Sequence, residues 1–395
     1  MNSFSATRGR LALCVALACA CGAAAQGTSN DDILAISWEQ ADTVAQQYDV
    51  ARALADSSSQ GSARLAATAL EQVLASRPEI RKGQDTALYE SLSRALIGVI
   101  ERWNYREAAH LLWTVVEDSA DPLSRADALM ALGSLAAAEY TTRIAAILSA
   151  LNGGPTTDPR GAEQVAFGAV VALERLRAPE GFPAVFYASA GWYGARVRTR
   201  AEGALSAILP DPTEAILSIL DADNPSSMRK ALAHGLGSKA ADDGKRRVAL
   251  KTLERGTTLG PGTTKADRKE LSALRMEAMA ALKRLPVSGD GRASLAAESY
   301  RIGTHDEKLE ALSLLGKDPS AEAAQALSDI ILRLDEDQRA GVGNADRTTL
   351  AKAAMEAAAE NRQRSLVTAV LAVRNNQGWS DSVIALAKAA LEALQ

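Results

Sequence analysis

The sequence predicts an all-α protein built as an α-solenoid of antiparallel helix pairs. Three observations lead to this fold class. The chain of 395 residues is 47% hydrophobic but only 4% aromatic, and its apolar residues are mainly Ala and Leu, which favour closely packed helices over strands. A pattern of small residues and leucine recurs along the chain, and each copy is followed by a second apolar segment. Such an array escapes the size limit of a single core, because each repeat packs only on its neighbours.

The N-terminal segment, residues 1–25, has the pattern of a secretory signal peptide. Arg8 and Arg10 supply the positive charge, residues 11–20 are apolar, and small residues lead up to Ala25 and Gln26. The apolar run is shorter than the roughly 20 residues that a membrane-spanning helix needs. We therefore expect cleavage between Ala25 and Gln26 and export to the periplasm or the extracellular space.

All three cysteines, Cys14, Cys19 and Cys21, lie in this segment. Cleavage would leave a chain without disulfides, thiolate metal ligands or a cysteine nucleophile. A second interpretation stays open, because the sequence around Cys19 and Cys21 loosely resembles a lipoprotein processing site. Acylation of either cysteine would anchor the protein to an envelope membrane, and this is the only way in which the sequence predicts membrane attachment.

The charge balance argues against a nucleic-acid partner. Removal of residues 1–25 takes away two arginines and no acid, which leaves 42 basic and 48 acidic residues and a net charge of −6. Proteins that bind nucleic acid usually carry a basic surplus.

Residues 26–120 are helical in pattern but match the repeat poorly, and we interpret them as one or two divergent repeats plus an N-terminal cap. The cluster Asn30-Asp31-Asp32 is a plausible helix start before Ile33. Arg64, Ala67 and Leu70 form a fragment of the repeat pattern. Terminal repeats are expected to be atypical, because they cover an exposed end.

Residues 121–395 are predicted to be the repeat array. Its pattern is a basic residue, small residues three and six positions later, and leucine seven positions later, as in Arg125, Ala128, Ala131 and Leu132. This spacing places the residues on one helix face, where small side chains let the next helix approach closely. The copies begin at Arg125, Ala166, Arg198, Arg229, Arg275, Lys308 and Ala351. Their mean separation is about 38 residues, near the roughly 40 of HEAT repeats.

Each copy is followed by a candidate second helix, and the longer intervals contain loops. The loops are expected at 152–161, 256–266 and 335–346, the last with Asp335-Glu336-Asp337 as solvated charge. The second helices are expected at 141–151, 181–190, 213–220, 245–253, 293–300, 321–334 and 382–394.

The string Asp121-Pro122, Arg125, Ala128 and Ala131-Leu132-Gly133 resembles the HEAT-repeat consensus, especially the short bacterial form related to phycobilisome-lyase repeats. The resemblance covers about residues 121–395 and implies an armadillo-like superhelix in which the basic residue joins a polar ladder between repeats. Other Asp-Pro pairs do not all precede a copy at the expected interval. The tetratricopeptide repeat is the alternative, but it expects large aromatic residues at set positions, which this chain lacks.

The sequence offers no catalytic or metal-binding motif. Its three histidines are far apart, and the hydrolase, zinc-protease and phosphate-loop patterns are absent. We therefore predict no catalytic residues, no metal site and no cofactor.

One stretch has an unusual aromatic content. Gly191-Trp192-Tyr193-Gly194 looks like a turn, and Arg196 and Arg200 follow it. Aromatic and arginine side chains are enriched at interaction hot spots, so Trp192, Tyr193, Arg196 and Arg200 form a candidate partner-binding patch. The competing interpretation is that these rings fill a wider gap between two repeats.

These observations predict a non-enzymatic, exported scaffold or adaptor that binds a protein or peptide partner on a solenoid surface. Two alternatives stay open: a lipid-anchored envelope assembly factor, and an enzyme accessory resembling the bilin-lyase repeat proteins.

Overall fold

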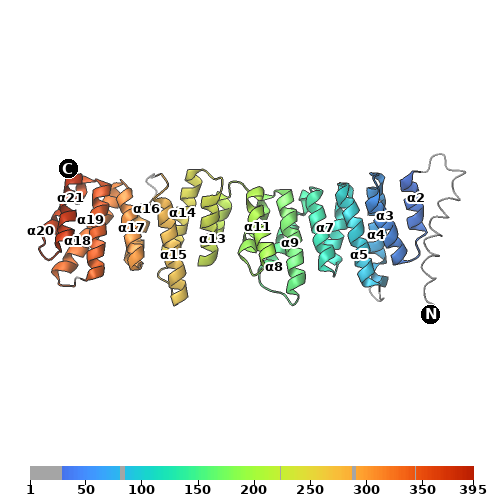
Figure 1. The fold of residues 1–395 in the computed structure, drawn as a ribbon, viewed down its shortest axis with the longest axis horizontal. Coiled ribbons are helices and arrows are strands. Elements are labelled where there is room, and N and C mark those ends of the chain that lie inside the picture. Colours follow the sequence, from blue (N-terminus) through green and yellow to red (C-terminus); the bar gives the residue numbers. More distant parts are fainter. Residues whose placement is uncertain (1–28, 81–84, 223, 287–290, 343) are drawn as a thin grey trace, which may run out of the picture. The chain divides into compact units, whose positions relative to one another are not determined.

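The computed structural model describes residues 29–80, 85–222, 224–286, 291–342 and 344–395. All regular elements in these ranges are helices, and none of these helices is long and apolar enough to cross a membrane. The chain divides into two compact units between Ile208 and Leu209, and each unit is described by itself (Figure 1).

The first unit contains ten α-helices among its described residues. They are α2 (Asn30–Glu39), α3 (Val44–Asp56), α4 (Gly61–Ile80), α5 (Thr86–Arg102), α6 (Ala109–Asp118), α7 (Pro122–Ser134), α8 (Thr141–Asn152), α9 (Pro159–Leu176), α10 (Phe182–Ala190) and α11 (Ala195–Ile208). From α3 to α11, each odd-numbered helix packs on the next odd-numbered helix, and each even-numbered helix from α4 to α10 packs on the odd-numbered helix that follows it. We call the odd-numbered helices the first helices and the even-numbered ones the second helices.

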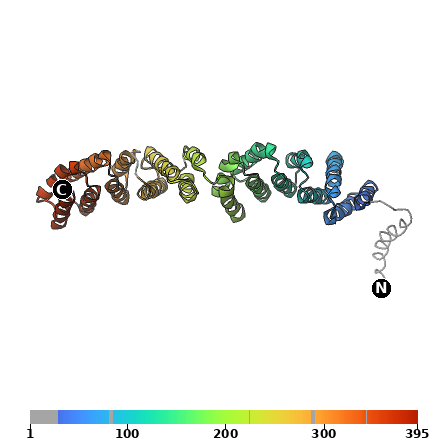
Figure 2. The same cartoon turned by 90° about the horizontal axis from the view of Figure 1, so that it is seen from above.

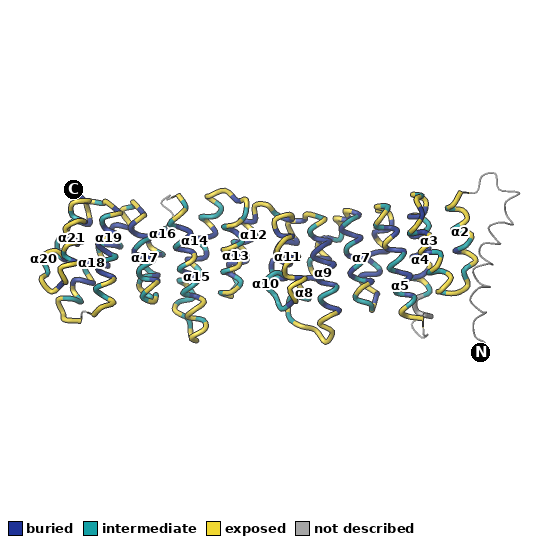
Figure 3. Tube along the Cα trace, in the orientation of Figure 1, coloured by how far each residue is buried: buried dark blue, intermediate teal, exposed yellow. Residues whose placement is uncertain are grey.

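The second unit repeats this plan. Its helices are α12 (Thr213–Ile219), α13 (Pro225–Gly237), α14 (Asp242–Thr258), α15 (Lys265–Leu282), α16 (Arg292–Ile302), α17 (His305–Lys317), α18 (Ala321–Arg339), α19 (Ala345–Asn361), α20 (Val367–Asn375) and α21 (Asp381–Ala393). Seen from above, the helices of each unit fall into two rows (Figure 2). The chain is therefore an α-solenoid, and the buried residues lie mainly where neighbouring helices meet (Figure 3).

All seven predicted copies of the repeat pattern lie on first helices, from α7 to α19. The small residues let these helices approach closely. A side-chain carbon added to Gly133 of α7 would lie 2.7 Å from the Cα of Ala172 in α9, and one added to Gly316 of α17 would lie 2.9 Å from the Cα of Ala357 in α19. The leucines fill the remaining space, as Leu132 and Leu315 are fully buried.

Four repeats share a backbone feature that the sequence analysis did not identify. Asn104, Ala136, Arg177 and Arg362 have left-handed φ angles of 51°, 51°, 50° and 61°. Each follows a first helix and precedes a short 3-10 turn, which leads into the second helix. None is glycine, the residue that usually marks this conformation. Because a non-glycine residue in this region is unfavourable by itself, packing of the two helices must hold the turn.

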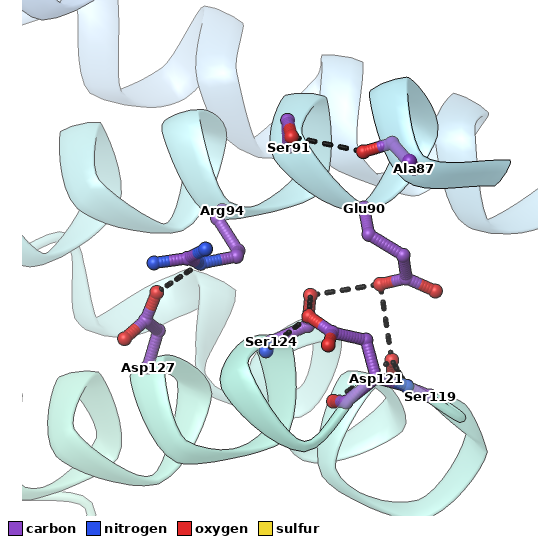
Figure 4. A network of polar contacts seen from close by, with 8 residues as sticks. All are labelled: Ala87, Glu90, Ser91, Arg94, Ser119, Asp121, Ser124 and Asp127. Carbon is purple, nitrogen blue, oxygen red and sulfur yellow. Dashed lines mark hydrogen bonds and ion pairs between the residues drawn. The ribbon is translucent and has the colours of Figure 1, made fainter. Parts of the chain in front are cut away.

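Polar contacts join successive first helices along one edge of the first unit (Figure 4). Arg94 of α5 binds Asp127 of α7 at 2.6 Å. Glu90 of α5 accepts a hydrogen bond at 2.7 Å from the hydroxyl of Ser124, and the backbone N–H of Ser124 donates to the helix-capping carboxylate of Asp121. The start of α7 is thus tied to the preceding repeat.

In two copies of the repeat, at Arg125 and Arg275, the basic residue bonds to the end of the preceding second helix. Nε of Arg125 donates to the carbonyl of Val116 near the end of α6 at 2.9 Å. Nη1 of Arg275 donates to the carbonyls of Gly256 and Gly260 at 2.9 and 2.7 Å, at the end of α14. Carbonyls at the end of a helix lack partners within the helix and carry partial negative charge. The arginine side chain satisfies them and joins two neighbouring helices.

Arg275 also forms a buried ion pair. Its Nε lies 2.6 Å from Oε1 of Glu307 in α17, and both side chains are at most 2% exposed. Burial raises the pKa of Glu307, but the hydrogen bond from Arg275, the bond from the Thr304 N–H and the Arg275 charge outweigh it, so the net pKa is lowered. This pair links α14, α15 and α17 within the core of the second unit.

The structure differs from the sequence analysis at two places near the C-terminus. The segment 335–339, expected to be loop, continues α18, and Asp335 is 3% exposed. Its carboxylate accepts hydrogen bonds from Asn376 Nδ2 at 2.8 Å and Trp379 Nε1 at 2.9 Å. These partners lie about forty residues further along the chain. The sequence analysis considered only the local run of acids, which is typical of a solvent-exposed loop, and therefore missed the burial of Asp335.

The last helix pair also differs. The second helix expected at 382–394 is α21, which packs on α19 and α20 as a first helix does. The second helix of that pair is the nine-residue α20, which the sequence analysis did not identify. The predicted division of the chain at residue 120 stays a prediction, and α3 and α5 stack in the same way as α7 and α9.

Replacing Glu307 by alanine should leave Arg275 buried and without its countercharge. We expect the opening free energy of α15 and α17, measured by amide hydrogen exchange, to fall by about 3–5 kcal/mol. The control is Glu298→Ala, which removes the exposed pair with Arg301 and should cost at most about 1 kcal/mol. Equal effects in the two variants would contradict the conclusion that Arg275 depends on Glu307 as its buried countercharge.

The same pair predicts a pH dependence. Because the folded-state pKa of Glu307 lies below its ordinary value of 4.5, the stabilisation is fully present above about pH 4.5 and is lost as the pH falls through the folded-state value. Glu307→Gln should reduce this acid dependence in hydrogen exchange of α17.

Candidate functional site

The aromatic turn predicted as a partner-binding patch lies between α10 and α11 in the first unit. Tyr193 is 2% exposed, and its hydroxyl donates to Oδ1 of Asn152 at 3.0 Å. Burial, with a smaller effect of the Glu163 charge, raises the pKa of Tyr193 above its ordinary value. Trp192 is half-buried, and its Nε1 donates to the carbonyl of Leu151 at 2.9 Å. Hydrogen bonds from the Trp192 and Tyr193 side chains thus attach the turn to the end of α8.

The two arginines of this patch hold α11 against α9. The guanidinium of Arg196 lies 4.2 Å from the ring centroid of Phe167, and Arg200 forms an ion pair with Glu174. Tyr193 belongs to the core and offers no free ring face, which corrects its place in the predicted patch. A partner-binding role for Trp192, Arg196 and Arg200 stays a prediction. Cys19, Cys21, Ala25 and Gln26 lie outside the described residues.

Tyr193→Ala should destabilise the first unit by about 3–5 kcal/mol, because it removes a buried aromatic side chain. Arg196→Ala should cost about 1 kcal/mol or less, since a partly exposed cation–π contact contributes little. Hydrogen exchange of α8 to α11 measures both effects. A stable Tyr193→Ala variant would contradict the assignment of this ring to the core.

A groove of about 920 Å³ opens in the second unit, at the end of α16. Its origin is the difference in length between two neighbouring second helices. α16 has 11 residues and α18 has 19, so about 12 Å of α18 extends beyond the length that α16 can cover. The groove is lined by the end of α16, the start of α17, the second half of α18 and the start of α19.

Tyr300 lies in the groove wall formed by α16. Its ring is half-buried, and Nζ of Lys308 lies 5.5 Å from the ring centroid. Burial raises the pKa of Tyr300 to about 12; the Asp337 charge adds to this shift, while Arg333 and Arg347 oppose it. The charges of α18 and α19 therefore act on the phenol from across the groove. Tyr300 stays a neutral hydroxyl at physiological pH and can donate or accept a hydrogen bond.

Some of the other charged groups of the groove already have partners within the protein, and others do not. Arg347 lies 3.3 Å from Asp337, and Asp329 accepts a hydrogen bond from Gln325 at 2.9 Å. Arg333 is exposed, and no hydrogen bond or ion pair to it is found among the described residues. The groove therefore presents polar groups that an external ligand could bind.

A second hollow, of about 530 Å³, lies at the other end of α16. Leu217 of α12 and Leu250 of α14 line it together with Ser294 and Leu295 of α16. Ser294 lies three and seven positions before Ala297 and Arg301, which line the groove, so these residues share one face of α16. The groove and the second hollow thus lie at opposite ends of one face of α16.

No group of three or more His, Cys, Asp or Glu side chains within the described ranges is placed to hold a metal ion. The sequence analysis missed the groove because no residue type marks it. Its only signal in the sequence is the unequal length of the two helices.

Comparisons with known proteins do not identify a family for this chain. No protein-family model and no curated protein matches this chain. One similar solved structure is described by the words "A conserved phosphorylation switch controls the interaction between cadherin and beta-catenin in vitro and in vivo". It is 12% identical, covers 92% of this chain and 94% of its own, and has a TM-score of 0.33. These values carry no argument about function, so the helical-repeat assignment rests on the helices and their packing.

Proposed function

We propose that this protein is a non-enzymatic scaffold that binds an extended segment of a protein partner along the face of α16. The observation that carries the proposal is the pair of hollows on one stripe of this helix. A row of packed second helices presents a long surface without dedicated chemistry, and repeat proteins commonly use such surfaces for binding. The groove is lined mainly by charged and polar side chains, and charge complementarity of this kind gives a binding surface specificity for its partner.

Two finer points belong to this proposal. The repeats are of the short bacterial HEAT type, which rests on Asp121-Pro122, Arg125 and Gly133, with Asp121 capping α7 as expected for an opening Asp-Pro. The protein is exported and acts in the periplasm or outside the cell, which rests on the pattern of residues 1–25.

Selection of peptides from a random library, followed by photo-crosslinking, tests the binding role. Ala297 lies in the groove, and Ala233 is an exposed residue of α13 outside both hollows. With a photoreactive phenylalanine at one of these positions, selected peptides should crosslink at position 297 and much less at 233. Arg333→Ala should weaken their binding about threefold to tenfold. Selected peptides that crosslink equally at both positions, or a selection without enrichment, would count against the scaffold.

Mass spectrometry of the mature protein tests export. The proposal expects an N-terminus at Gln26 in the fraction outside the cytoplasm. An acylated Cys19 or Cys21 would instead establish the lipid-anchored form, and an uncleaved chain in the cytoplasm would refute export.

A further inference from the structure

We propose that the groove beside α16 selects an extended peptide in which acidic and basic side chains alternate. This inference rests on the proposed function, because it names the ligand of the same site. It follows from the unequal charge of the two groove walls.

The wall formed by α16 and α17 is cationic. The charged or titratable residues that it contributes to the lining are Arg301, His305 and Lys308, and it contributes no carboxylate. Arg301 is paired with Glu298 of its own helix, outside the lining, so Lys308 is the cation of this wall that has no carboxylate partner among the described residues. The acids at the start of α17 do not weaken this charge at the groove: Asp306 is outside the lining, and Glu307 is buried against Arg275. Acidic ligand groups should therefore face this wall.

The wall formed by α18 and α19 is acidic. It contributes four carboxylates and two arginines, which are Asp329, Glu336, Asp337, Asp346, Arg333 and Arg347. One of these arginines, Arg347, is paired with Asp337. The wall therefore carries a net charge of −2, and the exposed carboxylates of Glu336 and Asp346 are open to basic ligand groups.

Tyr300 shows that the two walls lie within electrostatic reach of each other. It belongs to α16, yet the charges of Asp337, Arg333 and Arg347 act on its hydroxyl from α18 and α19. An extended peptide points successive side chains to opposite sides. A peptide that lies along the groove with acids at every second position would direct them to the cationic wall and its bases to the acidic wall. A run of one charge would place half of its side chains against a wall of the same sign.

Two synthetic peptides of identical composition test this pattern. One has Glu-Lys repeated four times, and the other has four Glu followed by four Lys; both are acetylated, amidated and fluorescently labelled. In fluorescence anisotropy with the full protein at about 50 mM salt, the alternating peptide should bind about tenfold more tightly. High salt should remove most of this difference, because exposed charge pairs are screened. Equal affinities, or tightest binding by an all-Glu or all-Lys peptide, would overturn the inference.

Charge reversals locate the effect. Arg301→Glu with Lys308→Glu should reduce binding of the alternating peptide to the level of the block peptide. The matched control reverses two exposed cations outside the groove, Lys230→Glu on α13 and Lys269→Glu on α15, and should change the affinity less than twofold. Lys308 packs on Tyr300, so its replacement could also affect folding. A second variant avoids this: Glu336→Lys with Asp346→Lys alters only exposed residues and should reduce the affinity for the alternating peptide to the same extent.

The result separates this inference from the proposed function. If library-selected peptides still crosslink at position 297 while the alternating and block peptides bind equally, the scaffold stands and the charge pattern is refuted. If no peptide crosslinks at position 297, both are refuted.

Discussion

The close approach of successive first helices is the constraint on which the rest of the structure depends. Gly133 against Ala172 and Gly316 against Ala357 leave no room for a single added carbon. Such contacts, about forty residues apart in the chain, set the spacing of the repeats. Both of these contacts join first helices. The second helices can therefore differ in length without disturbing the stack, and the short α16 beside the long α18 leaves the groove.

Charged side chains join neighbouring repeats at the helix ends. The small residues act elsewhere, on the faces where successive first helices touch. Arg125 and Arg275 satisfy carbonyls of the preceding second helix, and Arg275 is neutralised by Glu307. The buried pair by itself adds little to stability, because removing two charges from water offsets most of their attraction. Its role is to specify which helix ends meet. The start of α17, which lines the groove, is thereby placed against α15.

Much of the fold could be predicted from the sequence, because each repeat is built from local patterns. The spacing of Arg125, Ala128 and Leu132 located the first helices, and the apolar segments located most of the second ones. The exceptions depend on contacts between distant residues. Asp335 is buried by Trp379, and Tyr193 by the end of α8, which local composition does not reveal. The groove was not identified either. The helices predicted at 293–300 and 321–334 already differed in length, but no residue type marks the space that this difference leaves.

Substitution of a single glycine tests the central constraint most directly. Gly316→Ala places a carbon against the backbone of Ala357, whereas Gly98→Ala, in the middle of α5, meets nothing within 4 Å. Hydrogen exchange should show that Gly316→Ala destabilises α17 and α19 by about 1–3 kcal/mol. The same change at Gly98 should stabilise its helix by about 1 kcal/mol, as expected for an unhindered helical position. If both variants are stabilised alike, the close packing of the first helices does not set the repeat.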